Sequence, residues 1–146
     1  MSINTVLENY KVLFENLTPQ AVEHDFLSIF AHDIYFKDPF NEVQGLVATQ
    51  AVFHHMFKTL HEPQFQIIDM AGAARSGYLE WVFNFKLKAG ASAKTQQIKG
   101  VSRILINDSQ QVCSHIDYWD TGEFVYSKIP LLGRVIQFIN KRVSVP

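Results

Sequence analysis

The sequence predicts an α+β domain in which helices precede an antiparallel β-sheet. Apolar residues recur at helical spacing through the first 60 positions, and from Pro63 onward their period changes from 3.6 residues to 2. The period-2 segments follow one another with only short turns between them, which is typical of an antiparallel meander. The 146 residues have the length of one domain, 1–146, in which residues 122–146 form a helical tail.

The composition predicts a pocket or a subunit interface in addition to a core. Apolar residues make up 47% of the chain and charged residues 18%, and there are 12 phenylalanines. This composition argues against disorder and provides more apolar surface than a plain core needs. The net charge of −1 offers no basic field for phosphates, so we do not expect nucleic acid as a partner.

The sequence predicts a cytoplasmic location. Cys113 is the only cysteine, so the chain has no internal disulfide and a reducing compartment is favoured. The first residues contain neither a basic segment nor an apolar run of the kind found in signal peptides. No apolar run approaches the roughly 20 residues that a spanning helix requires.

Three helices are predicted in the first 60 residues. The first covers residues 4–16. Thr18 and Pro19 start the second, because Thr18 can cap it and Pro19 suits a first turn that needs no N–H. A short strand over 33–39, ended by Pro39, and a loop over 40–45 lead to a third helix over 46–60.

The second half of the chain is predicted to be four strands and a tail. The strands cover 65–73, 77–87, 96–106 and 112–120, with turns at 89–92 and 107–110. The tail contains a turn or short helix, interrupted by Pro130 and Gly133, and then a helix from about 132 to 142.

Alternation along the strands predicts which side chains face the interior. The aromatic face of 77–87 contains Trp81, Phe83 and Phe85, and the apolar face of 96–106 contains one hydroxyl, that of Ser102. Both faces of the last strand mix polar and apolar residues, so the pattern leaves its orientation open.

Several local motifs resemble one superfamily. A helix pair ends in Phe-Ala-His-Asp at 30–33, the first strand ends in Phe-Lys-Asp-Pro at 36–39, and a loop closing on Gly45 leads to a helix and four long strands. Over nearly the whole chain these features resemble the superfamily of nuclear transport factor 2, ketosteroid isomerase and the SnoaL-like polyketide cyclases. The resemblance implies a cone-shaped, cystatin-like fold with three N-terminal helices packed on a strongly curved antiparallel sheet.

The resemblance also implies roles for individual residues. Asp38 matches the general base of the isomerase, and His115, Asp117 and Trp119 match positions that face its pocket. Ser102 and Phe14 match its two oxyanion donors, so the sequence predicts that both donors are missing. Because such donors are worth roughly 3–4 kcal/mol each, ketosteroid isomerisation itself is not expected.

The sequence therefore predicts that a small apolar or aromatic molecule binds in a conical pocket. Acid–base catalysis of the isomerase, cyclase, dehydratase or epoxide-opening type would depend on Asp38, His115 and Asp117. Seven residues are predicted to contact the ligand: Phe14, Phe36, Trp81, Phe83, Phe85, Ser102 and Trp119. No cofactor or metal is expected, because zinc needs three or four ligands and this face offers one histidine with carboxylates.

Other interpretations remain open at this point. Asp38 can instead cap the loop that follows it, and the whole chain can be a non-catalytic carrier or an interaction module. Exposure of Tyr118 on a lone curved sheet favours a homodimer. The tail combines apolar residues with Lys128, Arg134, Lys141 and Arg142; closure of the cone or packing on a second subunit is favoured over an anionic membrane surface.

Overall fold

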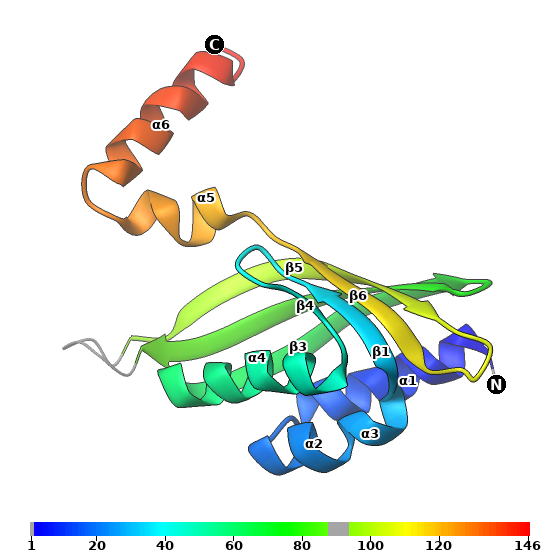
Figure 1. Cartoon of the computed structure of the whole chain (residues 1–146). Coiled ribbons are helices and arrows are strands. Elements are labelled where there is room, and N and C mark those ends of the chain that lie inside the picture. The colour runs from blue at the N-terminus through cyan, green and yellow to red at the C-terminus, as the bar shows by residue number, and fades with distance from the viewer. Residues whose placement is uncertain (1, 88–93) are drawn as a thin grey trace.

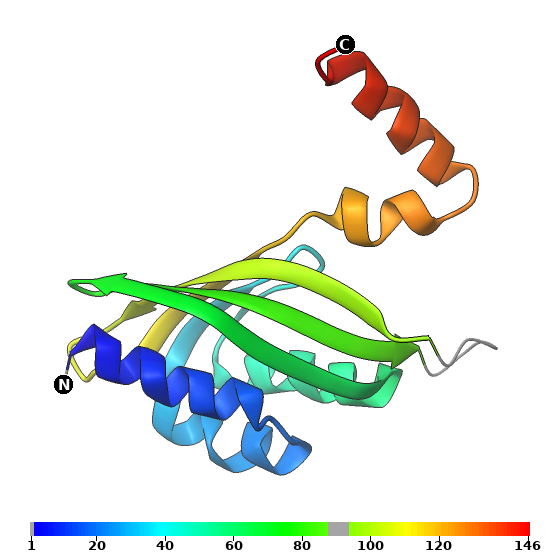
Figure 2. The same ribbon diagram turned by 180° about the vertical axis from the view of Figure 1, so that it is seen from behind.

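The computed structural model describes residues 2–87 and 94–146, so the turn predicted at 89–92 lies outside the described residues. Six strands form one sheet in the order β2-β1-β6-β5-β4-β3. The sheet is curved, and helices α1 to α4 lie together on one side of it (Figures 1 and 2). The predicted α+β class with N-terminal helices on a curved sheet is confirmed.

The N-terminal helices follow the predicted boundaries closely. They are α1 (Ile3–Glu15), α2 (Pro19–His24), α3 (Phe26–Ile29) and α4 (Leu46–Thr59). Thr18 caps α2 as predicted, because its side-chain oxygen accepts a hydrogen bond from the Ala21 N–H at 3.0 Å. The single second helix predicted from the sequence is divided into α2 and α3 at Asp25.

The strands are β1 (Phe30–Lys37), β2 (Glu42–Gln44), β3 (Leu60–Ala73), β4 (Ser76–Leu87), β5 (Gln96–Ile106) and β6 (Val112–Tyr118). β2 falls in the segment predicted as a loop and pairs with β1. The sheet is mixed and not wholly antiparallel, since β1 runs parallel to β6. The intervening helix α4 and strands β2, β3, β4 and β5 supply the long connection that a parallel pair requires.

The core lies between α1 and the concave face of the sheet. The buried residues of α1 form one stripe: Ile3, Val6, Leu7, Tyr10, Leu13 and Phe14. Leu79, Trp81 and Phe83 of β4 and Ser102 and Ile104 of β5 are buried on the facing side. The predicted inner faces of these two strands are therefore confirmed.

A β-bulge decides the orientation of β6. Val112 pairs with Ile106 and Ser114 pairs with Leu105, which leaves Cys113 as an extra residue between them. As a result Val112 and His115 are both buried, although strict alternation would send them to opposite faces. Cys113, which has the same parity as His115 and Asp117, is only half-buried.

The tail leaves the sheet beside the open end of the cone. It contains α5 (Thr121–Phe124), a 3₁₀ turn η1 (Tyr126–Lys128) and α6 (Leu132–Val143). Phe124 packs against the cluster of Trp81, Phe83 and Ile98, whereas α6 projects away from the body (Figures 1 and 2). In the described part of the chain, no helix has the length and apolar character needed to cross a membrane.

Gly100 allows Trp81 to lie flat across the neighbouring strand. A Cβ at this position would lie 2.6 Å from the Trp81 ring and 2.9 Å from the Tyr118 carbonyl oxygen. We expect Gly100→Ala to lower the free energy of unfolding by about 1–3 kcal/mol, because the ring must move. Urea unfolding measures this; the matched Gly122→Ala, whose Cβ meets only the Asp120 carboxylate, should change it by less than about 0.5 kcal/mol. Equal losses in the two variants would contradict the prediction.

Candidate ligand-binding site

Two adjoining hollows lie under the concave face of the sheet. The inner chamber has a volume of about 30 Å³, room for a group the size of a water molecule, and the outer cavity about 330 Å³. The side chains of Phe53, Phe65, Trp81 and Asp117 line both hollows. Asp117 therefore stands between the deepest part of the cone and its wider opening.

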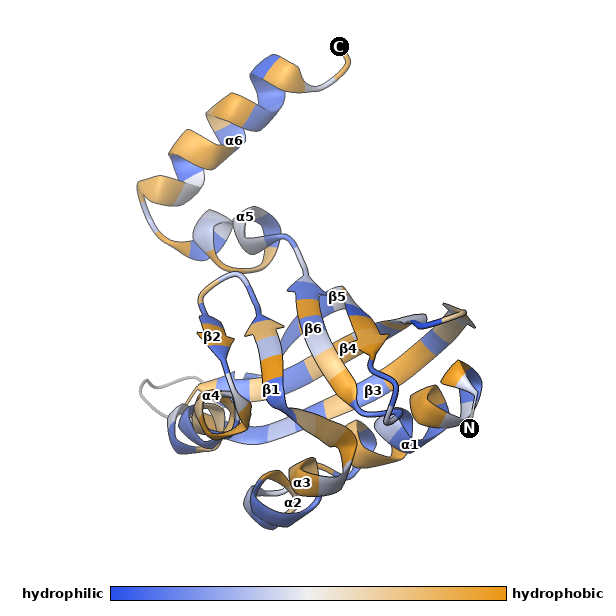
Figure 3. Cartoon of the chain, turned by 45° about the vertical axis from the view of Figure 1, so that its right-hand side comes forward, coloured by the Kyte–Doolittle hydropathy of each residue, from blue (hydrophilic) through white to orange (hydrophobic). Residues whose placement is uncertain are grey.

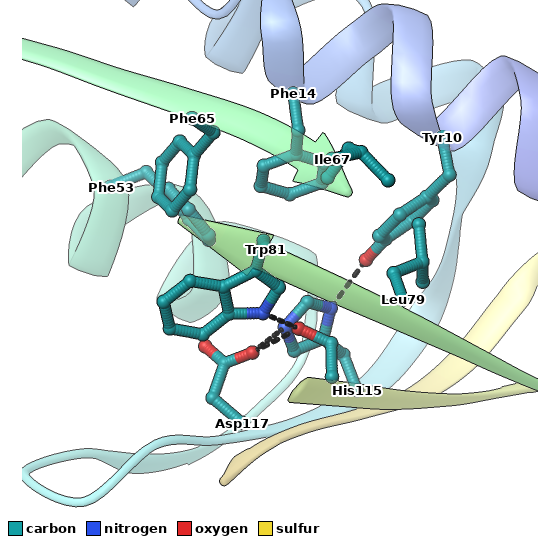
Figure 4. A pocket seen from close by; sticks show the side chains of 10 residues that line it. Tyr10, Phe14, Phe53, Phe65, Ile67, Leu79, Trp81, His115 and Asp117 are labelled. Carbon is teal, nitrogen blue, oxygen red and sulfur yellow. Dashed lines mark hydrogen bonds and ion pairs between the residues drawn. The ribbon is translucent and has the colours of Figure 1, made fainter. Parts of the chain in front are cut away.

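A chain of hydrogen bonds crosses the inner chamber (Figure 4). The Tyr10 hydroxyl on α1 lies 2.5 Å from His115 Nδ1 on β6, and His115 Nε2 lies 2.6 Å from Asp117 Oδ1. The imidazole is buried and stacks on the Phe36 ring with 4.9 Å between ring centroids. Helix α1 and strand β6 are thus connected through one histidine.

The same carboxylate oxygen receives a second hydrogen bond from the sheet. Ser102 Oγ lies 2.5 Å from Asp117 Oδ1, and Trp81 Nε1 lies 2.8 Å from Ser102 Oγ. An indole N–H can only donate, so Ser102 accepts from Trp81 and gives its own proton to Asp117. Among the described residues no hydrogen bond reaches Asp117 Oδ2, which points away from His115 in Figure 4.

The positions of the protons follow from this arrangement. Burial, and then the negative charge of Asp117, raises the pKa of the Tyr10 phenol well above its ordinary value of 10. Tyr10 therefore keeps its proton and donates it to His115 Nδ1. With Nδ1 accepting from the phenol, His115 donates from Nε2 to the carboxylate of Asp117, whose charge is the negative charge beside Tyr10.

Asp38 is half-buried where the outer cavity opens. Its Oδ1 accepts hydrogen bonds from the backbone N–H groups of Phe40 and Asn41, both at 2.7 Å, and Asn41 Nδ2 lies 3.1 Å from each carboxylate oxygen. The loop-capping role that the sequence offered as an alternative is therefore present. The same side chain also lines the cavity, so the two interpretations of Asp38 are compatible.

The family assignment agrees with this fold. The SnoaL-like domain family matches residues 13–115, more than half of the chain. The chain belongs to the SnoaL-like domain family. No functionally curated protein matches it.

Several solved structures share the fold of this SnoaL-like chain. A hypothetical protein with a ketosteroid isomerase-like fold from Catenulispora acidiphila, in complex with trimethylamine, has a TM-score of 0.68 at 12% identity over 82% of this chain and 88% of that one. A putative polyketide cyclase from Xanthomonas campestris has a TM-score of 0.67 at 16% identity, over 84% and 93%. An LEH-like epoxide hydrolase from M. tuberculosis has a TM-score of 0.63 at 12% identity, over 95% and 93%. At these identities the likeness establishes the fold alone.

In this SnoaL-like structure every predicted site residue lines one or both hollows. Phe14, Ser102 and His115 line the inner chamber. Asp38, Phe36, Phe83, Phe85 and Trp119 line the outer cavity, and Trp81 and Asp117 line both. Their roles in binding or catalysis stay predictions. Among residues 2–87 and 94–146, no group of three His, Cys, Asp or Glu side chains lies close enough to hold a metal ion.

The most important residue that the sequence missed is Tyr10. The superfamily resemblance matched the phenol position to Phe14, but a phenol enters this pocket one helical turn earlier. The available signal was a residue with a polar tip in the apolar stripe of α1, four positions from Phe14. The resemblance pointed to the Phe14 position alone for a phenol, and the structure places the phenol of Tyr10 in the same pocket.

The phenol does not restore an oxyanion clamp. The Tyr10 proton is directed at His115, and the Ser102 proton is directed at Asp117. Neither hydroxyl has a proton left for a developing oxyanion in the cavity. The reason for not expecting ketosteroid isomerisation, the lack of a free oxyanion donor, therefore still applies.

We expect Tyr10→Phe to lower the free energy of unfolding at neutral pH by about 1–3 kcal/mol, because His115 Nδ1 loses its donor in a buried site. Above pH 10 the unfolded wild-type chain loses the phenol proton while the folded chain keeps it, so wild-type stability falls. The difference in the free energy of unfolding between wild type and Tyr10→Phe should therefore decrease by about 1.4 kcal/mol per pH unit above pH 10.

Urea unfolding from pH 7 to pH 11 measures this gap. The matched core variant Phe14→Leu removes no titratable group. Its difference from wild type in the free energy of unfolding should therefore stay constant as the pH rises. A Tyr10→Phe gap that stays constant up to pH 11 would show that the phenol does not keep its proton in the folded chain.

Proposed function

We propose that this chain binds a small, mainly apolar molecule in the outer cavity and transfers protons to and from it through Asp117 and Asp38. One observation carries the proposal. Asp117, with its side chain 17% exposed, bears a negative charge between two apolar hollows and accepts both of its hydrogen bonds on one oxygen. The other oxygen is available to a bound molecule.

The shape and lining of the outer cavity support ligand binding. Its volume of about 330 Å³ lies at the lower end of the range for small-molecule sites. Aromatic rings form much of the wall: Phe65 stacks on Phe83 with 4.3 Å between centroids, and Phe83 lies 5.1 Å from Phe85. At the opening, Phe40 packs edge-on against Trp119. A flat or branched apolar molecule would fit between these rings.

The two carboxyl groups suit a reaction in which one proton is removed and another is returned. Asp117 is oriented by His115 and Ser102, so its free oxygen is a positioned general base. Asp38 lies beside Asp117, because the two residues directly follow Lys37 and Ile116, which pair between β1 and β6, and Asp38 is held by its own loop. Cyclisation and epoxide opening both need such proton transfers, and the Xanthomonas and M. tuberculosis neighbours are described as a putative cyclase and an epoxide hydrolase.

The charges around the cavity favour neutral or cationic ligands over anions. Asp38 and Asp117 line it, and no lysine or arginine is found among its described lining residues. Aromatic faces such as those of Trp81 and Trp119 add attraction for an ammonium group. The Catenulispora neighbour was solved with trimethylamine.

Intrinsic fluorescence can test this selectivity, because both tryptophans of the chain, Trp81 and Trp119, line the cavity. Phenyltrimethylammonium, tert-butylbenzene and benzenesulfonate have similar shapes and charges of +1, 0 and −1. We expect the first two to bind and the third to bind at least about tenfold more weakly. Asp117→Asn should weaken the binding of phenyltrimethylammonium alone, by about fivefold to tenfold. Tighter binding of the sulfonate would contradict the proposed cavity.

Catalysis is tested separately, with a panel of epoxides, β-hydroxyketones and β,γ-unsaturated ketones of matching size. For any compound that the wild type converts, Asp117→Asn should lower kcat/KM by about 10²–10⁴-fold, while the affinity for tert-butylbenzene stays the same. Asp38→Asn tests the second carboxyl in the same way. Full turnover in both variants would exclude these carboxylates from the chemistry, and binding without any turnover would favour the carrier interpretation.

A further inference from the structure

The tail differs in charge from the rest of the chain. Residues 1–123 contain 9 lysines and arginines and 14 acidic residues, which gives −5, whereas residues 124–146 contain 4 cations and no acidic residue. The two parts sum to the net charge of −1. The last 23 positions, which include α6, therefore carry a net charge of +4, whereas the rest of the chain is net negative.

Helix α6 is amphipathic and its apolar side is uncovered. Five residues at i, i+3 and i+4 spacing form a stripe along it: Leu132, Val135, Ile136, Ile139 and Val143. Val135 is 53% exposed and Val143 81% exposed. At 100° per residue, Arg134 and Lys141 lie on the opposite side of the helix. The hydropathy colouring of Figure 3 shows this helix, with its apolar and polar segments, standing clear of the body.

A tight corner sets the direction of α6. Gly133 is buried against the preceding turn, and a Cβ there would lie 2.3 Å from the Ser127 carbonyl oxygen, so only glycine permits the approach. Upstream of this corner, Val125 lines the outer cavity and Phe124 packs on the cluster around Trp81. Through this corner α6 is joined to a segment that lines the outer cavity, while the helix itself projects away from the body (Figure 1).

We infer that α6 binds the surface of an anionic lipid bilayer, with its apolar stripe in the acyl boundary and its cations at the headgroups. Twelve residues give a helix of about 18 Å, which is too short to span the roughly 30 Å hydrocarbon core but suits an interfacial position. Exposed Leu131 and Val145 extend the apolar surface at both ends of the helix. A bilayer can cover all of these residues at once without a matching groove.

The charges favour a membrane over a second copy of the chain. The outer face of the sheet, where the sequence predicts a homodimer contact, exposes Val101 and Tyr118 and carries charges of both signs, with Glu80 between Lys99 and Arg103. A basic tail meets like as well as opposite charges on this face, whereas an anionic bilayer presents negative charge alone. This inference goes beyond the proposed function: membrane docking would hold the cavity opening near the phase in which apolar molecules concentrate.

Flotation of the full-length protein with vesicles tests the inference. Vesicles of 70% phosphatidylcholine and 30% phosphatidylglycerol should bind the protein, and pure phosphatidylcholine vesicles should bind it far more weakly. Each cation near such a surface contributes about fivefold in affinity, so the triple variant R134Q/K141Q/R142Q should bind about 100-fold more weakly. I139N/V143N should also lose binding, because it interrupts the apolar stripe.

The matched control removes three cations from the body, as K11Q/K58Q/K99Q. It changes the net charge by the same amount and should retain vesicle binding, since α6 is untouched. The inference is overturned if wild type does not float with the anionic vesicles, or if the control loses as much binding as the tail variant. It is also overturned if the tail substitutions convert a dimer to a monomer in sedimentation while vesicle binding is absent, because a second copy would then cover α6.

Discussion

The hydrogen bonds that converge on Asp117 Oδ1 are the constraint on which the rest of this site depends. Two donors from different elements, His115 Nε2 and Ser102 Oγ, meet at one oxygen, and each is held in turn by Tyr10 or Trp81. Unsatisfied polar groups at this depth would each cost about 1–3 kcal/mol, so the network holds together as a unit. It connects α1 with β4, β5 and β6, and it fixes which atoms are free for chemistry.

The direction of the protons limits what this site can do. Tyr10 and Trp81 act as the outer donors, and every proton in the network points toward the negative charge of Asp117. The network therefore stabilises a carboxylate and has no hydroxyl left for a substrate oxygen. A site of this kind is suited to removing a proton, whereas stabilisation of an enolate would require a donor from the ligand itself or from another group at the mouth, such as Asn41 or His55.

Local and alternating patterns in the sequence were sufficient for most of the fold and for the walls of the cavity. Thr18 with Pro19 indicated the start of a helix. Alternation identified the inner faces of β4 and β5, because β4 contains no bulge between Trp81 and Phe85 and β5 contains none between Ile98 and Ile106. The bulge at Cys113 hid the orientation of β6, since one extra residue reverses the parity of everything beyond it. Tyr10 was missed because a residue within the apolar stripe of a helix is normally interpreted as part of the core. The parallel pairing of β1 with β6 was missed because it is a long-range contact that no local pattern encodes.

The floor and the mouth of the cavity are built in different ways. The floor comes from adjacent strands in the middle of the sheet, where neighbours on both sides fix each backbone, so Ser102, His115 and Asp117 have little freedom. The mouth comes from less regular parts: the 38–41 loop, one face of α4 and Val125 in the tail. Solved neighbours at 12–16% identity keep the fold and can differ at such positions without disturbing the sheet. In the proposed function, Asp117 therefore acts from the rigid floor and Asp38 from the mouth, where residues such as Phe40, Asn41 and Trp119 would select the ligand.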